Sequence, residues 1–221
     1  ENGIEWVAIC PGAFTMGSVK GEAMAQQNEI VDPPRVVALS AFQIAATETT
    51  HRQYAQMVSD HKERDDQPVV DVTWEQARSF CQRGGGDLPT EAQWEYAARG
   101  GSRTPWSFGE EESQIGRYAW FAENSGNQAH DVKQKLPNPL GLYDLHGNVW
   151  EWTRDWYDNY RAGTFVDPEE SAITGRRVLR GGSFVVSPEV LRSAFRFVVD
   201  PEYRRRFFGF RCVRVPPQQV D

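Results

Sequence analysis

Apolar and polar residues of this chain alternate over short stretches that end at turn residues. Residues 4–18 (IEWVAICPGAFTMGS) alternate and turn at Pro11-Gly12, which predicts a hairpin. Residues 19–34 are polar and predict a loop. Residues 35–48 (RVVALSAFQIAATE) predict a pair of strands. We therefore expect the first part of the chain to form small sheets rather than helices.

Helical spacing of the apolar residues follows these strands. The first predicted helix covers Thr49 to about Val58. Each of the next two begins with a threonine followed three residues later by a glutamine, which is a capping-box pattern, and each stops at a glycine. These two helices are expected from Thr73 to Gly84 and from Thr90 to Gly100.

The remainder of the chain favours loops and short strands. Residues 101–140 are rich in Gly, Pro and Asn and predict a long loop, which in a compact domain is usually functional or pinned by contacts. Short strands and turns are expected over 149–215. No internal repeat or shift in composition divides the chain. The prediction is an α+β protein with few helices, short irregular sheets and much loop, in a single domain over residues 1–221.

Composition narrows the classes of function. The 221 residues are 39% hydrophobic, enough for one sizeable core. A net charge of −7 argues against a nucleic-acid partner. Arg204-Arg205-Arg206 is interpreted as a solvated rim, with a grip on an anionic ligand as the alternative. No stretch has the length of a membrane span, and no signal segment is visible.

Three cysteines show neither zinc spacing nor a disulfide framework. Cys81 falls in a predicted helix and Cys212 in a predicted strand, so both are expected to be buried free thiols. Cys10, before a Pro-Gly turn, has no clear role. Free cysteines favour a cytoplasmic location, although the compartment stays unknown.

Several motifs carry a resemblance to a known family. "PGAFTMGS", "LPTEAQWEYAARGG", "GLYDLHGNVWEWTRDWY", "RVLRGGSF" and "GFRCVR" occur in this order. The set resembles the formylglycine-generating enzyme (sulfatase-modifying factor) family. The resemblance covers nearly the whole chain and implies a C-type-lectin-like fold.

The resemblance does not carry over the family's catalytic chemistry. Catalytic members bind copper through two cysteines that follow the Arg-Gly-Gly-Ser turn, and the matching positions here are Val186 and Leu191. Neither side chain can ligate a metal, so we expect no copper and no formylglycine generation. The four histidines are scattered, and His146 is expected to be a hydrogen-bonded structural residue.

One metal site is implied by the resemblance. "YDLHGNVWE" is similar to the family's structural calcium loop. Asp144 and Glu151 would supply side-chain oxygens, and Gly147 and Val149 would supply backbone carbonyls, a hard-oxygen set that suits calcium. In the alternative, the two acids cap backbone amides.

Two further sets of residues are interpreted as structural. The aromatic run Trp150, Trp152, Trp156 and Tyr157 predicts core packing rather than a cofactor site. Arginines within and next to the carboxyl-terminal motifs are expected to brace the backbone by bonding carbonyls and acids, as their multi-donor heads allow. They are Arg180, Arg192, Arg196 and Arg211.

Segment 180–212 holds many apolar residues at irregular spacing, which no single strand or helix period explains. We predict that it is a binding segment and that a subset of Val186, Phe195, Phe197, Val199, Tyr203 and Phe207 is exposed. The segment also resembles the variable region of proteins diversified by retroelements, where mutated asparagine codons yield this set of residue types. The candidate ligand-binding residues are Val185, Val186, Ser187, Val190, Phe195, Phe197, Val198, Val199, Asp200, Tyr203, Phe207 and Phe208.

The sequence therefore favours a non-catalytic module that binds an unknown protein or small molecule through this segment. A second hypothesis is an iron-dependent oxidoreductase of the sulfoxide-synthase or pyoverdine-maturation type, with unidentified site residues. A third is a sensor domain fused to a kinase or protease.

Overall fold

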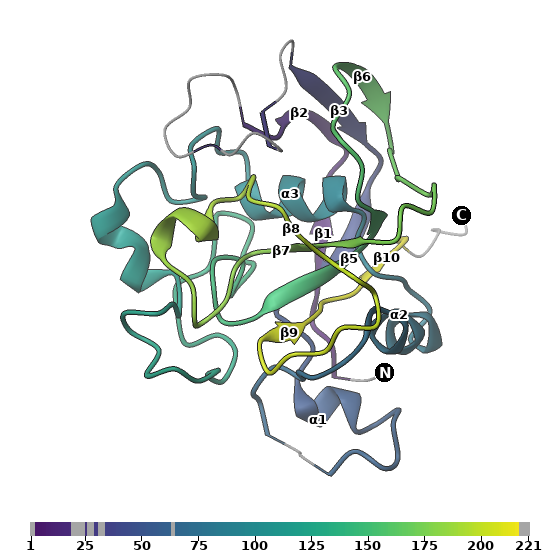
Figure 1. The fold of residues 1–221 in the computed structure, drawn as a ribbon, viewed down its shortest axis with the longest axis vertical. Coiled ribbons are helices and arrows are strands. Elements are labelled where there is room, and N and C mark those ends of the chain that lie inside the picture. Colours follow the sequence, from purple (N-terminus) through teal and green to yellow (C-terminus); the bar gives the residue numbers. More distant parts are fainter. Residues whose placement is uncertain (1–2, 19–24, 26–28, 31–33, 63–64, 217–221) are drawn as a thin grey trace.

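The computed structural model describes residues 3–18, 25, 29–30, 34–62 and 65–216 (Figure 1). Its fold is α+β, with short strands, few helices and much loop, as the sequence predicts. The strands are β1 (Trp6–Ile9), β2 (Gly12–Met16), β3 (Arg35–Leu39), β4 (Phe42–Ala45), β5 (Trp150–Trp156), β6 (Gly163–Val166), β7 (Arg177–Arg180), β8 (Phe197–Val199), β9 (Phe208–Gly209) and β10 (Val213–Arg214). The helices are α1 (His51–Tyr54), α2 (Trp74–Arg83) and α3 (Glu91–Arg99), with 3-10 turns η1 (Glu112–Arg117) and η2 (Pro188–Leu191).

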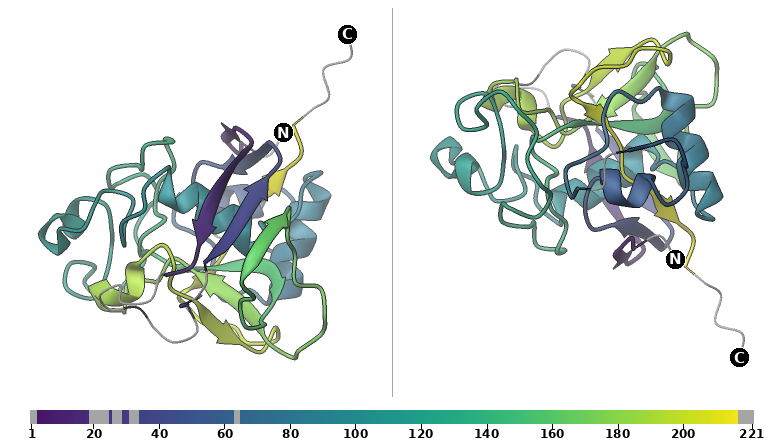
Figure 2. Two further views of the ribbon diagram at one scale, coloured as in Figure 1. Left: turned by 90° about the horizontal axis from the view of Figure 1, so that it is seen from above. Right: turned by 90° about the horizontal axis from the view of Figure 1, so that it is seen from below.

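Three small sheets organise the described strands. Their orders are β1-β4-β10, β2-β3-β6 and β8-β7-β5-β9. In Figure 1, β5 and β7 cross the middle of the molecule, and α3 lies above them. The first and last strands both flank β4, so the two ends of the fold lie on the same side (Figure 2).

The predicted hairpin over 4–18 is wrong, because β1 and β2 do not pair with each other. Instead β1 pairs with β4, and β2 pairs with β3. Ile9 lies opposite Phe42 and Gly12 opposite Leu39, so one antiparallel register continues through both pairs. The Pro11-Gly12 signal marks the interruption between β1 and β2 rather than a reversal of the chain, since proline cannot donate to the ladder.

The two predicted capping boxes are confirmed. The side chains of Thr73 and Thr90 each accept a hydrogen bond from the backbone amide of the glutamine three residues on. The side chain of that glutamine in turn accepts a hydrogen bond from the backbone amide of the threonine. The α3 helix ends at Gly100, which has a positive φ of 54°. The first helix is shorter than predicted, since only His51–Tyr54 is α-helical behind its own Thr50 cap. Most of the predicted loop over 19–34 lies outside the described residues.

The long segment 101–140 contains no named strand but is pinned by side chains. Trp106, Ile115 and Phe121 pack with Leu191 in one buried cluster. The amide of Ser193 also donates to the carbonyl of Pro105, at 2.8 Å. This long loop is therefore held against the segment that follows the Arg-Gly-Gly-Ser turn.

Cys81 and Cys212 form a disulfide, which corrects the prediction of two free thiols. The last turn of α2 packs beside the start of β10 and places their Cα atoms 5.5 Å apart, within disulfide range. Both residues belong to the main core cluster, and Cys10 is free and exposed. Because two of the three cysteines are bonded to each other, the cysteines no longer favour a cytoplasmic location. Within the described ranges, no helix is long and apolar enough to cross a membrane.

Candidate functional site

The four arginines interpreted as a frame are buried and bonded as predicted. Each is paired with a buried glutamate from a distant part of the chain. Two-point hydrogen bonds join three of these pairs, with donor–acceptor distances between 2.6 and 3.0 Å. The pairs are Arg192–Glu29, Arg196–Glu91, Arg211–Glu151 and Arg180–Glu95.

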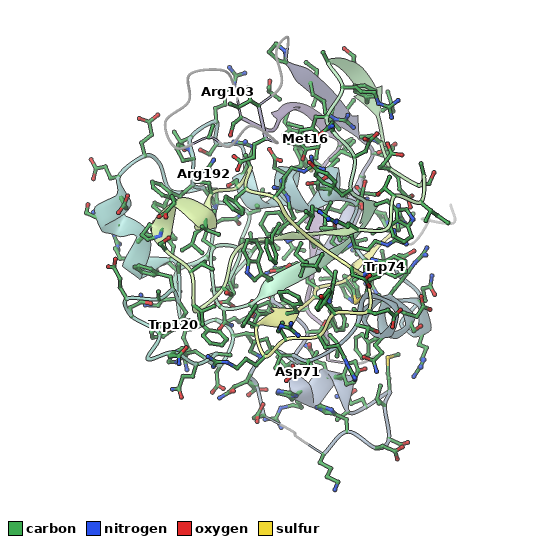
Figure 3. The ribbon with its side chains drawn as sticks, viewed as in Figure 1. Met16, Asp71, Trp74, Arg103, Trp120 and Arg192 are labelled. Carbon is green, nitrogen blue, oxygen red and sulfur yellow. A yellow bond between two sulfur atoms is a disulfide. The ribbon has the colours of Figure 1, made fainter. Side chains whose placement is uncertain are left out.

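These pairs hold segment 180–212 from its buried side. Arg180 also donates to the carbonyl of Phe195 and lies 3.6 Å from Glu91. Burial alone would raise the pKa of Glu91, but Arg196 and Arg180 outweigh it and hold this pKa below its ordinary value. Figure 3 places Arg192 where η2 ends. The segment is thus fixed by charged side chains that point inward.

The turn between β7 and η2 requires glycine. Gly181 and Gly182 have φ of 95° and 80°, and a Cβ on Gly182 would overlap the side chain of Leu191. The same added Cβ would lie 3.3 Å from the side chain of Val186. The two positions that match the catalytic cysteines are therefore filled by apolar side chains that pack with Trp106 and Phe121.

His146 is a structural residue, as predicted. Its Nδ1 bonds the carbonyl of Leu191 at 2.8 Å, and its Nε2 bonds the hydroxyl of Ser107 at 2.9 Å. Burial lowers the pKa of His146 to about 4, so the ring is neutral at ordinary pH. It links the Trp-rich motif to the long loop and to η2.

The candidate ligand-binding residues differ in exposure. Phe195 and Phe208 are buried in the main core, at 7% and 2% exposed, which corrects their assignment to a binding surface. Exposed members are Ser187, Phe197, Asp200 and Tyr203. The others are half-buried: Val185, Val186, Val190, Val198, Val199 and Phe207.

Strand geometry explains the two corrections. Phe197 is an end residue of β8 and lies opposite Leu179 of β7, on a face that solvent reaches. Phe195 precedes the strand and turns inward against Trp150, with ring centroids 5.9 Å apart. Phe208 lies on β9, a strand paired with β5 and covered by Trp152. The adjacent Phe207 and Phe208 thus differ in burial as strand alternation predicts, whereas Phe195 is buried outside the strand.

Aromatic rings connect the exposed surface to the core. Phe197 stacks on Trp150 at a centroid distance of 5.1 Å, and Phe207 contacts Phe208 at 5.2 Å. Trp150 and Trp152 are buried, as the sequence predicts. The exposed apolar positions thus stand on a rigid aromatic base.

The residues predicted to bind calcium lie in a buried acidic cluster. The carboxylate of Glu151 accepts hydrogen bonds from the guanidinium of Arg211 and from the indole N–H of Trp94. Asp144 accepts the amide of Lys133 through one oxygen, and its other oxygen is buried without a partner. Burial raises the pKa of Asp144 to about 6.

Glu48 is a third acid in this cluster, and the sequence analysis missed it. Its carboxylate accepts the amide of Val149 and the side chain of Asn148. Burial, together with Asp144 and Glu151, raises its pKa well above the ordinary value. Three carboxylates thus face one guanidinium, and both oxygens of Glu48 and of Glu151 already have partners. Within the described residues, no group of three or more His, Cys, Asp or Glu side chains could hold a metal ion. Calcium binding itself stays a prediction.

Sequence reasoning also missed the glutamates that receive the arginines. Glu91 and Glu95 are four residues apart on α3, on a helix side that also holds the buried Ala92 and Trp94. Two acids on an otherwise apolar helix face were a signal for buried ion pairs. His51 and His61, which appear scattered in the sequence, lie 2.7 Å apart through ring nitrogens.

Comparisons with known proteins agree with this geometry. Residues 1–216 match the family described as sulfatase-modifying factor enzyme 1-like domain. The formylglycine-generating enzyme of Streptomyces coelicolor is 37% identical over 171 residues, covering 70% of this chain and 54% of that protein. Serine/threonine-protein kinase pkn1 of Chlamydia pneumoniae is 32% identical over 246 residues, covering 95% of this chain and 38% of the kinase.

Solved structures give the same fold. Treponema denticola variable protein 1 is 28% identical with a TM-score of 0.85, covering 96% of this chain and 95% of that one. PvdO from Pseudomonas aeruginosa is 26% identical with a TM-score of 0.86, covering 97% and 95%. The chain spans about half the length of the first curated relatives it matches. The fold is the C-type-lectin-like fold expected from the resemblance, and the chain belongs to the sulfatase-modifying factor enzyme 1-like domain family.

Proposed function

We propose that this domain is a non-catalytic binding module and that segment 180–212 displays its binding surface. The observation that carries the proposal is the division of this segment into two sets. The four arginines are buried and fixed to glutamates, whereas all candidate positions except Phe195 and Phe208 reach solvent at least in part. A frame of this kind tolerates change at its exposed positions, because their side chains contribute little to the core.

Similarity to a variable protein supports the proposal. The Treponema denticola protein shares the fold over nearly the whole chain and is named a variable protein. The exposed and half-buried candidates are residue types that mutated asparagine codons yield. Retroelement diversification is part of the proposal, and a reverse-transcriptase gene beside a near-copy of the 180–212 coding segment would test it directly.

A library experiment tests the display function without knowledge of the native ligand. Positions 187, 197, 200 and 203 are randomised together, while the four arginines are kept. Most members should retain the wild-type melting temperature, and binders to a chosen target such as hen lysozyme should be selectable. A matched library randomised at 195 and 208 should fail to fold. If the first library unfolds as often as the second, the surface is not a display surface.

Similarity to PvdO supports an oxidoreductase as the second candidate. Metal analysis separates the two functions, since stoichiometric iron or copper after purification would favour the enzyme. Formylglycine formation from a cysteine peptide is not expected with copper and oxygen supplied, because Val186 and Leu191 cannot supply thiolates. Aldehyde product above a no-protein control would contradict this expectation.

Similarity to pkn1 supports a role for such a domain within a signalling protein. The matched region makes up 38% of the kinase, so in that protein a domain of this kind stands beside other sequence. In such a protein, ligand binding at the exposed surface of this domain would regulate the rest of the chain.

A further inference from the structure

Arg204, Arg205 and Arg206 form an exposed run of cations at the edge of the proposed binding surface. Among the described residues, none of the three is within ion-pair distance of an acid. Asp200 and Glu202 lie on the same loop; one oxygen of Asp200 accepts the amide of Glu202, and neither acid pairs with these guanidinium groups among the described residues. The loop therefore carries acids that do not neutralise its guanidinium groups.

The remaining arginines of segment 180–212 behave differently. Arg180, Arg192, Arg196 and Arg211 are each paired with a buried glutamate. Exposed arginines elsewhere also have acidic partners, such as Arg52 with Asp66 and Arg161 with Glu170. Other exposed arginines, such as Arg103 and Arg117, also lack an acidic partner among the described residues, but only positions 204–206 bring three such cations together in sequence within this part of the chain.

Two of these guanidinium groups are held in place. Arg206 donates to the backbone carbonyl and to the side-chain oxygen of Asn127, at 2.9 and 2.8 Å. Arg205 donates to the carbonyl of Arg204 at 2.8 Å and lies 5.1 Å above the ring of Tyr203. Side chains that are already ordered lose less conformational entropy when a partner binds.

Exposed aromatic side chains precede the cations along the chain. Tyr203 is 50% exposed and Phe197 is 37% exposed, and both lie on the loop or strand that leads to Arg204. Tyrosine and arginine together are typical of binding hot spots. We define the arginine–aromatic surface as Phe197, Val199, Tyr203, Arg204 and Arg205.

We propose that the arginine–aromatic surface docks a polypeptide whose binding face combines carboxylates with aromatic or aliphatic side chains. This inference rests on the proposed binding function and names the chemistry of its partner. Carboxylates pair with the free guanidinium groups, and the apolar groups of the partner cover Phe197 and Tyr203. A nucleic acid fits less well, because three cations neutralise few phosphates and the rest of the acidic chain repels a polyanion.

The test uses a fluorescent random copolymer of glutamate and tyrosine as the probe. Fluorescence anisotropy with the wild-type chain should show saturable binding that weakens as salt concentration rises. Arg204→Glu/Arg205→Glu should weaken the binding by about tenfold or more, which corresponds to about 1.4 kcal/mol. Arg206 is left intact because it anchors the loop to Asn127.

The matched control is Arg103→Glu/Arg117→Glu, which changes the net charge equally at two exposed arginines elsewhere. In Figure 3, Arg103 lies at the opposite end of the molecule from Asp71, whose amide bonds the carbonyl of Arg205. This control should bind the copolymer like the wild type. Equal weakening in both double variants would overturn the proposal, as would binding of a thymidine oligonucleotide as tight as that of the copolymer.

Failure of this inference can be told from failure of the proposed function. If the library of exposed positions folds and yields binders while the copolymer does not bind, only the acidic partner is wrong. If the library unfolds but copolymer binding still depends on Arg204 and Arg205, the surface is a docking site and the display function is wrong.

Discussion

Arg196 and Glu91 meet through two hydrogen bonds, Nε to Oε1 at 2.6 Å and Nη2 to Oε2 at 2.8 Å, with both side chains buried. Breaking a buried pair by removing one partner leaves an uncompensated charge and typically costs about 3–5 kcal/mol. We expect Glu91→Gln to lower the free energy of unfolding by about this amount, measured by urea denaturation.

The control for this variant is Glu169→Gln. Glu169 pairs with Arg154 at 2.9 Å but is partly exposed, so its loss should cost about 1 kcal/mol or less. Similar losses in both variants would show that Glu91 is not part of a buried frame.

Exposed and buried phenylalanines of the same segment should respond differently to substitution. Phe197→Ser and Tyr203→Ser should leave the melting temperature close to that of the wild type, because both side chains face solvent. Phe195→Ser and Phe208→Ser should cost about 3–5 kcal/mol, since both truncate a core side chain. Thermal melts of the four variants check this, and a large loss at Phe197 or Tyr203 would place those residues in the core.

Reduction should destabilise the protein through the disulfide that joins Cys81 and Cys212. The bond closes a loop with a sequence separation of 131. For a loop of this length, the chain-entropy model gives about 5 kcal/mol. Thiol titration of the unreduced, denatured chain should find a single reactive group at Cys10, whereas three would show that the bond does not form.

Asp155 should make stability depend on pH. Burial and the neighbouring Glu91 raise the pKa of Asp155 to about 7 in the folded state. An acid with a raised pKa contributes stability that is present below its unfolded pKa of 3.8 and is lost as the pH rises through about 7. The free energy of unfolding of the wild type, relative to Asp155→Asn, should therefore fall from pH 4 to pH 7 and level off above it.

Asp66 provides a control of the opposite sign. Its hydrogen bond to Arg52 lowers the pKa of Asp66, so its contribution is lost as the pH falls. The stability of the wild type relative to Asp66→Asn should rise or stay flat with pH. A flat difference for Asp155→Asn would mean that Asp155 titrates alike in the folded and unfolded chain.

Calcium should raise the melting temperature through Asp144. This prediction rests on the family resemblance and on the buried, unpartnered oxygen of Asp144, since no group of three or more acids or histidines among the described residues could hold a metal ion. A free ion at a hundredfold excess over its Kd adds about 2.7 kcal/mol to stability. Asp144→Asn keeps the backbone conformation of this residue, whose φ is 59°, and should abolish the response to calcium. A calcium response that survives in this variant would place the ion elsewhere.

Local signals in the sequence predicted local structure. The capping boxes at Thr73 and Thr90 involve residues three positions apart, so the pattern specifies the helix start. The hairpin predicted at Pro11-Gly12 is wrong because a turn residue can mark either a chain reversal or an interruption of a strand. Which of the two occurs depends on the strands that pair with the flanking residues. Fold and family came from the motifs rather than from periodicity.

Long-range relationships could not be derived from one sequence. The need of each frame arginine for an acid was predictable, but its partner was not, because Glu29 lies 163 residues from Arg192. The disulfide was missed for the same reason, since its two cysteines come from different elements. Phe195 and Phe208 were misplaced because adjacent apolar residues on irregular strands do not reveal which member faces inward.

The direction of the four buried ion pairs has a consequence for synthesis of the chain. In every pair the glutamate precedes the arginine, by 60 residues for Glu151–Arg211 and by 85 for Glu95–Arg180. A growing chain therefore carries all four carboxylates before their counter-charges have been made. Because an unpaired buried charge is unfavourable, we expect the interior around Glu151 to stay open until Arg211 has been made. Fragments that stop before Arg211 should thus remain open to proteases.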